Sequence, residues 1–429
     1  MPSNNLTSDD KLKKFLLKKS SNSTMAFLDD RDKWLERDLL NIANVVFNIE
    51  KLIKNGQHVG KVVIPLSPET ISRVDLVLLQ NELEDLLLYV LIEKVEIGFS
   101  KDFRIYPEKR SRYEPQQHET VSLFSGGVDS YSGILNWAEK FQNVAGIAVI
   151  HGDQPWGSNI IDKITSRIGS EYEISFHKMY APRMTSTGYS QLRGVLYSLY
   201  AGIYLNMMDA RTLLISEVGP TMYQPRFSPY DSVTMTTHPF VLKKVKRILK
   251  LMLDRDFKIA IPFENMTKAE VAAASPLKEG LPLTHSCISL RFGRSDGTCY
   301  GCTIRRLGLL VAGVPDTEYL KDPIGDKEAD ADNISSLVRF SYDILTNFGN
   351  MLDSATENIV DYGKRDLFKR FSLDTFAGLY LYQSEIGPLN PYLEAIYKSA
   401  VDRLTQQRLE KRIAKVRRPT FKPNFSKTV

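Results

Sequence analysis

The sequence predicts an α/β protein built on a doubly wound parallel sheet, with an N-terminal α/β accessory domain and a helical C-terminal domain. Short apolar segments typical of buried strands alternate with helical patterns over residues 117–320, and such alternation gives βαβ units and a parallel sheet. The 429 residues are enough for two or three domains. A hydrophobic content of 43% is ordinary for globular proteins and supplies a large core.

The accessory domain is expected over residues 27–116, after a polar, lysine-rich tail at 1–26 that we expect to be disordered. Its expected elements share apolar periodicity and are a helix over 39–49, a strand over 61–66 and a helix over 82–91. A polar segment with two prolines, residues 106–118, reads as the linker to the next domain.

The central sheet is expected in residues 117–320. Its expected strands are 120–124, 144–150, 172–176 and 212–215, and its clearest helices are 130–141 and 190–208. Ligands of parallel sheets bind beyond the carboxyl ends of the strands. Residues that directly follow these strands are therefore the first candidates for a site.

Residues 321–429 carry long helical patterns and end in a basic tail. A basic tail can bind nucleic acid or an acidic partner, but a solvated terminus is the interpretation we favour. The N-terminus lacks the apolar segment of a secretion signal, and the chain has no run of about 18 uncharged apolar residues. We therefore expect a cytoplasmic protein that does not enter a membrane.

A loop between the first central strand and its helix has the composition of a phosphate-binding site. We expect the following six residues to bind a nucleotide: Ser125, Gly126, Gly127, Val128, Asp129 and Ser130. Glycines let backbone N–H groups approach phosphate oxygens at a helix N-terminus, and the serine hydroxyls can donate to them. Asp129 would act through Mg²⁺ or position the loop. The alternative is an ordinary Gly-Gly turn, and the Walker motif of γ-phosphate transferases is absent.

Ser-Gly-Gly-x-Asp-Ser after a strand resembles the signature of the PP-loop ATP pyrophosphatases, which have an adenine nucleotide alpha hydrolase-like fold. This superfamily includes the 7-cyano-7-deazaguanine synthases (QueC), asparagine and GMP synthetases, and tRNA thiolases. The resemblance implies that ATP places its β,γ-phosphates on the loop while the substrate attacks the α-phosphate and pyrophosphate leaves. It also implies that Val149 and His151, at the end of the second strand, line the adenine pocket.

All three cysteines, Cys287, Cys299 and Cys302, lie close together in the sequence. Random scatter would place them so closely only about 1% of the time, which favours a metal site over a metal-free loop with three reduced thiols. Cys299 and Cys302 have the spacing of a zinc knuckle. Three cysteines in a chain of this length rule out a disulfide scaffold.

The segment 285–305 resembles the cysteine motif of QueC enzymes without a gap, except that Asp296 stands where the family has its second cysteine. The resemblance implies zinc bound by the three cysteines and Asp296, with His285 or water as an alternative fourth ligand. Such an ion is expected to hold a substrate lid, because thiolate ligands leave it little Lewis acidity. Arg305 falls on the conserved arginine of the motif and is expected to bind substrate.

Four further residues match positions of QueC-like proteins or their superfamily, and the first three have a simpler alternative. Arg193 is expected to bind phosphate or a substrate carboxylate, unless it is a surface arginine. Glu217 would accept from a guanine-like edge, unless it caps a helix. His238 would contact substrate, unless it is a structural hydrogen-bonding residue. Lys268 would reach the α- or β-phosphate, and we expect Asp129, Arg193 and Lys268 to be catalytic.

The added regions resemble enlarged QueC-like proteins of bacterial anti-phage systems, such as QatC of the Qat system and the QueC-like component of type IV CBASS. This implies adenylation of a carboxylated 7-deazaguanine-type substrate and amide formation, conjugating the base to a protein partner encoded in the same defence operon. The alternatives are 7-cyano-7-deazaguanine (preQ0) synthesis for tRNA queuosine, a tRNA-thiolating enzyme, and a non-catalytic nucleotide-binding scaffold.

Overall fold

The computed structural model describes residues 34–101, 116–151, 155–181, 190–223, 225, 227, 236–287, 293–329, 331–346, 363–401, 405–418 and 421–429. The expected tail at 1–26 and most of the expected linker lie outside the described residues. Among the described residues, no helix is long and apolar enough to cross a membrane.

Five parallel strands form the central sheet, in the order β5-β4-β3-β6-β7. The strands are β3 (Thr120–Leu123), β4 (Val144–His151), β5 (Ser175–Ala181), β6 (Thr212–Leu214) and β7 (Lys258–Ala260). From β3 the chain adds β4 and β5 on one side, and then returns to add β6 and β7 on the other. The winding therefore reverses between β3 and β6, and parallel sheets bind ligands at such a point.

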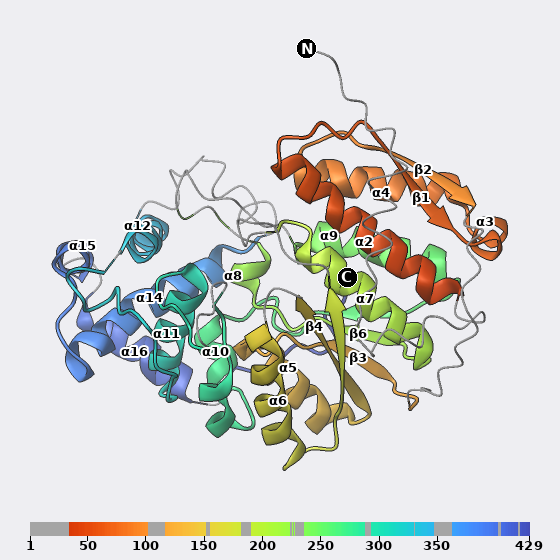
Figure 1. Ribbon diagram of the computed structural model, residues 1–429. Coiled ribbons are helices and arrows are strands. Elements are labelled where there is room, and N and C mark those ends of the chain that lie inside the picture. The colour runs from red at the N-terminus through yellow and green to blue at the C-terminus, as the bar shows by residue number, and fades with distance from the viewer. Residues whose placement is uncertain are drawn as a thin grey trace.

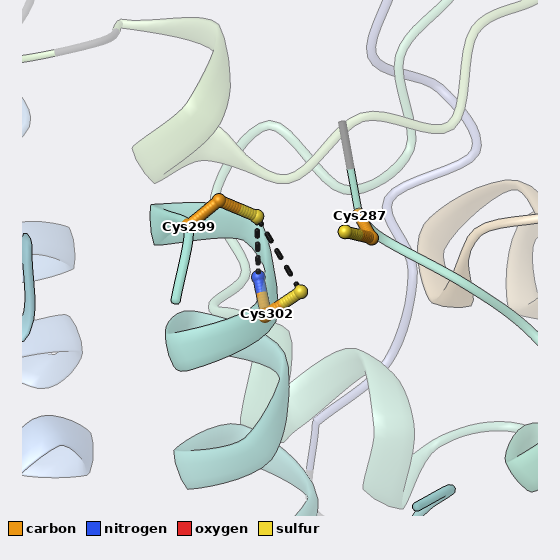
Figure 2. Close-up of side chains that lie close together, drawn as sticks. All are labelled: Cys287, Cys299 and Cys302. Atoms are coloured by element: carbon orange, nitrogen blue, oxygen red, sulfur yellow. Dashed lines mark hydrogen bonds between the residues drawn. The ribbon is translucent and has the colours of Figure 1, made fainter. Parts of the chain in front are cut away.

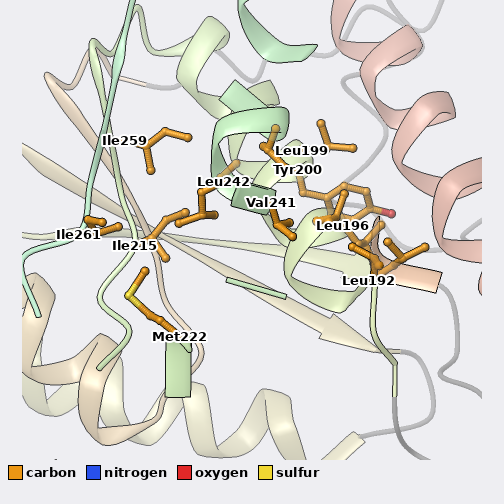
Figure 3. Packing of buried hydrophobic residues seen from close by; sticks show 14 of the residues in the cluster. Leu192, Leu196, Leu199, Tyr200, Ile215, Met222, Val241, Leu242, Ile259 and Ile261 are labelled. Atoms are coloured by element: carbon orange, nitrogen blue, oxygen red, sulfur yellow. The ribbon is translucent and has the colours of Figure 1, made fainter. Parts of the chain in front are cut away.

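Helices cover both faces of this sheet (Figure 1). One face carries α7 (Arg193–Met207) and α9 (Pro239–Leu253), whose apolar side chains meet those of the strands in the cluster of Figure 3. The other face carries α5 (Val128–Phe141) and α6 (Pro155–Gly169), with α10 (Lys268–Ala273) packed on α5. Burial on both faces explains why the inner strands, such as β4 and β6, are largely apolar.

The N-terminal region packs on the outer side of α7 and α9. Its elements are α2 (Trp34–Lys54), β1 (Lys61–Leu66), α3 (Pro68–Arg73), α4 (Leu76–Leu91) and β2 (Glu96–Lys101). Strands β1 and β2 pair in parallel as a separate two-stranded sheet. Helix α2 packs along α7, and α4 packs against α9, so Leu39 and Leu83 belong to the same buried cluster as the apolar residues of the central sheet.

The C-terminal region is helical, as the sequence predicts. Its helices are α11 (Tyr300–Ala312), α12 (Asp332–Thr346), α14 (Arg365–Glu385), α15 (Pro391–Val401) and α16 (Gln406–Arg417). Helix α14 packs against α11, α12 and α16. Two short elements complete the described structure, α8 (Gly219–Met222) and the 3₁₀ helix η3 (Lys278–Leu283).

Residues 421–429 correct the expectation of a solvated tail. This segment lies along β7, where Ala260 and Thr428 form an antiparallel bridge. The ring of Phe425 contacts Trp137 with 5.7 Å between centroids. Because an unpaired strand edge leaves backbone N–H and C=O groups unsatisfied, the segment stabilises the edge of the sheet that β7 forms.

The expected strands at 120–124, 144–150 and 212–215 match β3, β4 and β6, but β5 begins three residues later than the strand expected at 172–176. Its range follows from its pairing with β4, which extends from Ala145↔Ser175 to His151↔Ala181. Most side chains of β5 are only half-buried, so this strand lacks the apolar run that marks the central ones.

Candidate functional site

A cavity of about 640 Å³ lies beyond the carboxyl ends of β3 and β6. Its walls come from the loop after β3, the start of α7, the residues after β6, and the segment 285–287 with the start of α11. The predicted site residues that line it are Ser125, Gly127, Val128, Asp129, Ser130, Val149, Arg193, Glu217, Lys268, Cys287 and Cys299. Segments far apart in the sequence thus converge where the winding of the sheet reverses.

Two positions of the loop after β3 require glycine. Gly126 has φ +74°, and a Cβ there would lie 2.8 Å from Cδ1 of Ile161. A Cβ at Gly127 would lie 3.0 Å from the carbonyl oxygen of His285, and the amide of His285 in turn donates to the carbonyl of Gly126 at 2.9 Å. The bend is therefore fixed by close approach of α6 and of the segment that leads to the cysteines.

The two serine hydroxyls hold this bend closed. Ser130 Oγ donates to the carbonyl of Gly127 at 3.1 Å and accepts from the amide of Ser125 at 3.2 Å. Gly127 is the N-cap residue of α5 and supplies no side-chain cap. The N–H groups of the first turn have no partner within the helix, so they and the positive end of the helix dipole remain suited to an anion.

Lys268 and Asp129 form a buried ion pair at the cavity wall, with 2.5 Å between Nζ and Oδ2. Helix α10 begins with a capping box between Thr267 and Glu270, which fixes Lys268 in its first turn. The other carboxylate oxygen of Asp129, Oδ1, is buried and accepts no hydrogen bond from a described residue. Buried polar atoms are normally satisfied, and a carboxylate oxygen is the ligand type that Mg²⁺ prefers. Asp129 therefore fits a role as a Mg²⁺ ligand.

Glu217 and Arg193 add a second pair of charges to the cavity. Burial, and then the negative charge of Asp129, raise the pKa of Glu217 to about 7, while Lys268 and Arg193 act in the opposite direction. The guanidinium of Arg193 makes no hydrogen bond with a described residue, and it lines the cavity. A planar donor set of this kind suits a carboxylate or phosphate ligand.

Replacing Glu217 by glutamine should change how stability depends on pH. Because the pKa of Glu217 is raised from 4.5 to about 7 in the folded protein, the folded state holds its proton more tightly than the unfolded state. Wild-type stability should therefore fall, relative to Glu217→Gln, as pH rises from about 4.5 to 7, by on the order of 2 kcal/mol. Urea unfolding of both proteins across this pH range measures the difference. If the unfolding free energies of the two proteins changed with pH in the same way, the raised pKa of Glu217 would be contradicted.

Glu50, which the sequence analysis missed, fixes the start of α7. Its carboxylate accepts from the hydroxyl of Ser190 at 2.5 Å and from the amides of Gln191 at 2.6 Å and Leu192 at 3.0 Å. The donors lie directly before Arg193, so a residue of α2 positions the cavity arginine. The sequence does carry a signal for this role. Glu50 is an acidic residue at a position of α2 where the apolar periodicity of the helix predicts a buried side chain.

Glu50→Ala should lower the free energy of unfolding by about 2–3 kcal/mol, because three donors lose a charged acceptor in a buried position. Lys54→Ala is the matched control, since it removes the ion pair that Lys54 makes with Glu50 at 2.8 Å and leaves the three donors of the α7 start with their acceptor. It should cost under about 1 kcal/mol. Urea unfolding of both variants measures the two free energies. Equal losses of unfolding free energy would show that the three hydrogen bonds to Glu50 add no stability.

Aromatic side chains line the part of the cavity beyond Glu217. They are Tyr197, Phe227 and Tyr300, and the rings of Phe227 and Tyr300 lie 4.9 Å apart between centroids. Flat apolar walls next to a few polar groups are typical of sites for planar ligands. None of these rings was singled out from the sequence, because they come from three unrelated segments.

The three cysteines form one cluster at the cavity wall, and their sulfur atoms all lie within 4.8 Å of one another (Figure 2). Cys299 is the N-cap of α11 and accepts from the amide of Cys302 at 3.4 Å, while Cys287 accepts from the amide of Asp296 at 3.2 Å. The proximity of the other sulfurs raises the pKa of Cys302. The cluster could bind a metal such as zinc, whose charge would favour the thiolate forms.

We expected the carboxylate of Asp296 to be a zinc ligand, but the structure does not bring it into the cysteine cluster. Its carboxylate is not among the ligand atoms of the group and instead accepts from the amide of Thr298 at 2.9 Å. Asp296 supports the loop through this contact and through its own amide, which donates to Cys287. An Asx turn of this kind satisfies the carboxylate locally.

Two residues expected to bind substrate are structural. Arg305 is fully buried and donates to Asp316 at 2.8 Å, Thr284 at 2.6 Å and the carbonyl of Leu281 at 3.0 Å. His238 is also fully buried. Both lie outside the residues that line the cavity. These positions correct our expectation for Arg305 and His238.

His238 is the N-cap of α9, and its Nδ1 accepts from the amide of Phe240 at 3.3 Å. Burial lowers its pKa to about 4, which keeps the ring neutral and able to accept. Val149, which we expected in an adenine pocket, lines the cavity, whereas the side chain of His151 lies outside the described residues. No protein-family model matches this chain.

Proposed function

We propose that this chain is a PP-loop ATP pyrophosphatase of the QueC type that adenylates a carboxylated 7-deazaguanine-type base. The observation that carries the proposal is the glycine bend at 126–127, which leads into the uncapped start of α5 beside the Lys268–Asp129 pair. Together they offer N–H groups, an ammonium group and a carboxylate oxygen that has no partner among the described residues, which suits a nucleoside triphosphate with Mg²⁺.

In the proposed reaction, a carboxylate oxygen of the substrate attacks the α-phosphorus of ATP, and the bond to the departing pyrophosphate breaks. An amine then attacks the activated acyl carbon, AMP leaves, and the amine proton passes to solvent. Lys268 would bind the phosphates, and Asp129 would hold Mg²⁺, which supplies charge neutralisation for pyrophosphate when bound. These residues act by orientation and electrostatics.

The substrate assignment is supported by the chemistry of the cavity beyond the loop. Arg193 would bind the substrate carboxylate through two parallel hydrogen bonds. Glu217 would accept from the paired N–H groups of a guanine-like edge, and Tyr300 with Phe227 would stack on the flat ring. The adenine would lie against Val149.

The partner and setting rest on the resemblance to enlarged QueC-like defence proteins. On this basis the amine belongs to a protein encoded in the same anti-phage operon, and the base becomes conjugated to it in the cytoplasm. Zinc at the cysteine cluster would fix the segment 285–287 against the loop after β3.

The test is to incubate the purified protein with ATP, Mg²⁺, an ammonium salt and 7-carboxy-7-deazaguanine, with and without the co-expressed operon partner. We expect pyrophosphate and AMP in equal amounts and an increased intact mass of the partner. Free 7-cyano-7-deazaguanine with an unmodified partner would instead indicate the housekeeping synthase. ATP binding without pyrophosphate release would indicate a scaffold and overturn the proposal.

A further inference from the structure

The cysteine cluster lacks one ligand among the described residues. Its three sulfurs, from Cys287, Cys299 and Cys302, form a group that could hold a metal ion, and neither an imidazole nor a carboxylate completes it. Zinc in proteins almost always has four ligands, and a site with three protein ligands takes water or another small molecule in the fourth position.

The two nearby residues that could supply a fourth ligand are used elsewhere. The carboxylate of Asp296 accepts from the amide of Thr298 at 2.9 Å and also from its hydroxyl. The ring of His285 is directed to the loop after β3, since a Cβ at Gly126 would lie 3.4 Å from its Nε2. Neither side chain therefore belongs to the group of ligand atoms that the three sulfurs form.

The location of the cluster decides what fills the remaining position. Cys287 and Cys299 line the cavity that also contains Arg193, Glu217 and the loop after β3, whereas Cys302 is fully buried behind them. We propose that a zinc ion at this cluster has three sulfur ligands and an exchangeable fourth position on the cavity side. Water fills this position in the resting protein, and a neutral nitrogen donor of a small ligand replaces it.

Charge favours a neutral donor over an anion. Three thiolates with Zn²⁺ carry one net negative charge, and an anionic fourth ligand would add a second in a half-buried wall. Two amides, those of Asp296 and Cys302, donate to the sulfurs, and such bonds stabilise the existing thiolates. An amine or imidazole nitrogen suits the borderline softness of zinc and adds no charge.

The test measures coordination and does not depend on the proposed adenylation. X-ray absorption of the zinc-loaded full chain should fit three sulfur neighbours and one nitrogen or oxygen neighbour. In cobalt-substituted protein, imidazole should shift the visible bands of the ion saturably. Asp296→Asn should leave the starting spectrum and the imidazole response unchanged, while Cys302→Ala should lose the ion.

Two results would overturn the inference. Visible bands that imidazole does not change would show that the fourth position is closed. A starting spectrum altered by Asp296→Asn would show that this carboxylate is the ligand. Both results come from the visible spectrum of the metal ion, so they can be interpreted whether or not the chain releases pyrophosphate from ATP.

Discussion

Asp129→Ala should reduce pyrophosphate release from ATP by about 10²–10³-fold, the cost of removing one preorganised charged group from a reacting phosphate site. The substitution removes Oδ1, the buried oxygen without a described partner, and leaves Lys268 without its ion-pair partner. Initial rates with saturating substrate, measured by coupled detection of pyrophosphate, give the comparison with wild type.

Asp162→Ala is the matched control for this experiment. Asp162 is an aspartate of the neighbouring helix α6 that pairs with Lys178 at the surface and does not line the cavity. It should leave the rate within about twofold of wild type, because exposed ion pairs contribute little. An Asp129→Ala protein that folds normally and retains wild-type rates would remove the basis of the proposed mechanism.

Arg412→Ala should lower the free energy of unfolding by about 3–5 kcal/mol, because it leaves the buried carboxylate of Asp374 without its counter-charge, whereas Glu270 keeps its ion pair with Arg370. Arg412 donates to Asp374 at 2.7 Å and to Glu270 at 2.7 Å, and all three side chains are nearly inaccessible. Glu270 is also part of the capping box before Lys268. The variant should therefore loosen the site as well as the C-terminal helices.

Arg408→Ala supplies the comparison, since Arg408 is an exposed residue of the same helix α16 and its loss should cost under about 0.5 kcal/mol. Urea unfolding of the two variants, followed by far-UV circular dichroism, measures both losses. Similar midpoints for Arg412→Ala and Arg408→Ala would show that the buried network adds no net stability.

Local patterns predicted the elements that carry the site. The strand expected at 120–124, the glycine bend and the helix expected at 130–141 were each signalled by the local sequence, and the structure has the strand at 120–123 and the helix at 128–141. Strand β7 was missed, and so was the pairing of residues 421–429 with it, because that pairing joins segments far apart in the chain and leaves no local pattern.

The errors at the site arose where a side chain depends on a distant segment. Arg305 is satisfied by Asp316, Thr284 and Leu281, and nothing in its own helix signals this. His238 appeared as a lone histidine although Tyr89, from the N-terminal region, lies 3.1 Å from its Nδ1. The error at Asp296 is of another kind, because its carboxylate accepts from Thr298 in a local turn that the alignment with the cysteine motif did not reveal.

The contact between Glu50 and the start of α7 limits how the protein can be dissected. A chain trimmed to begin at residue 117 would lose this carboxylate and would leave the outer apolar flanks of α7 and α9 in water. If such a chain aggregated or were inactive, the cause would be the exposed apolar surface of α7 and α9. The result would not show that the N-terminal region has a function of its own. Point substitutions on the outward face of α2 or α4 are the cleaner way to ask what the first hundred residues contribute.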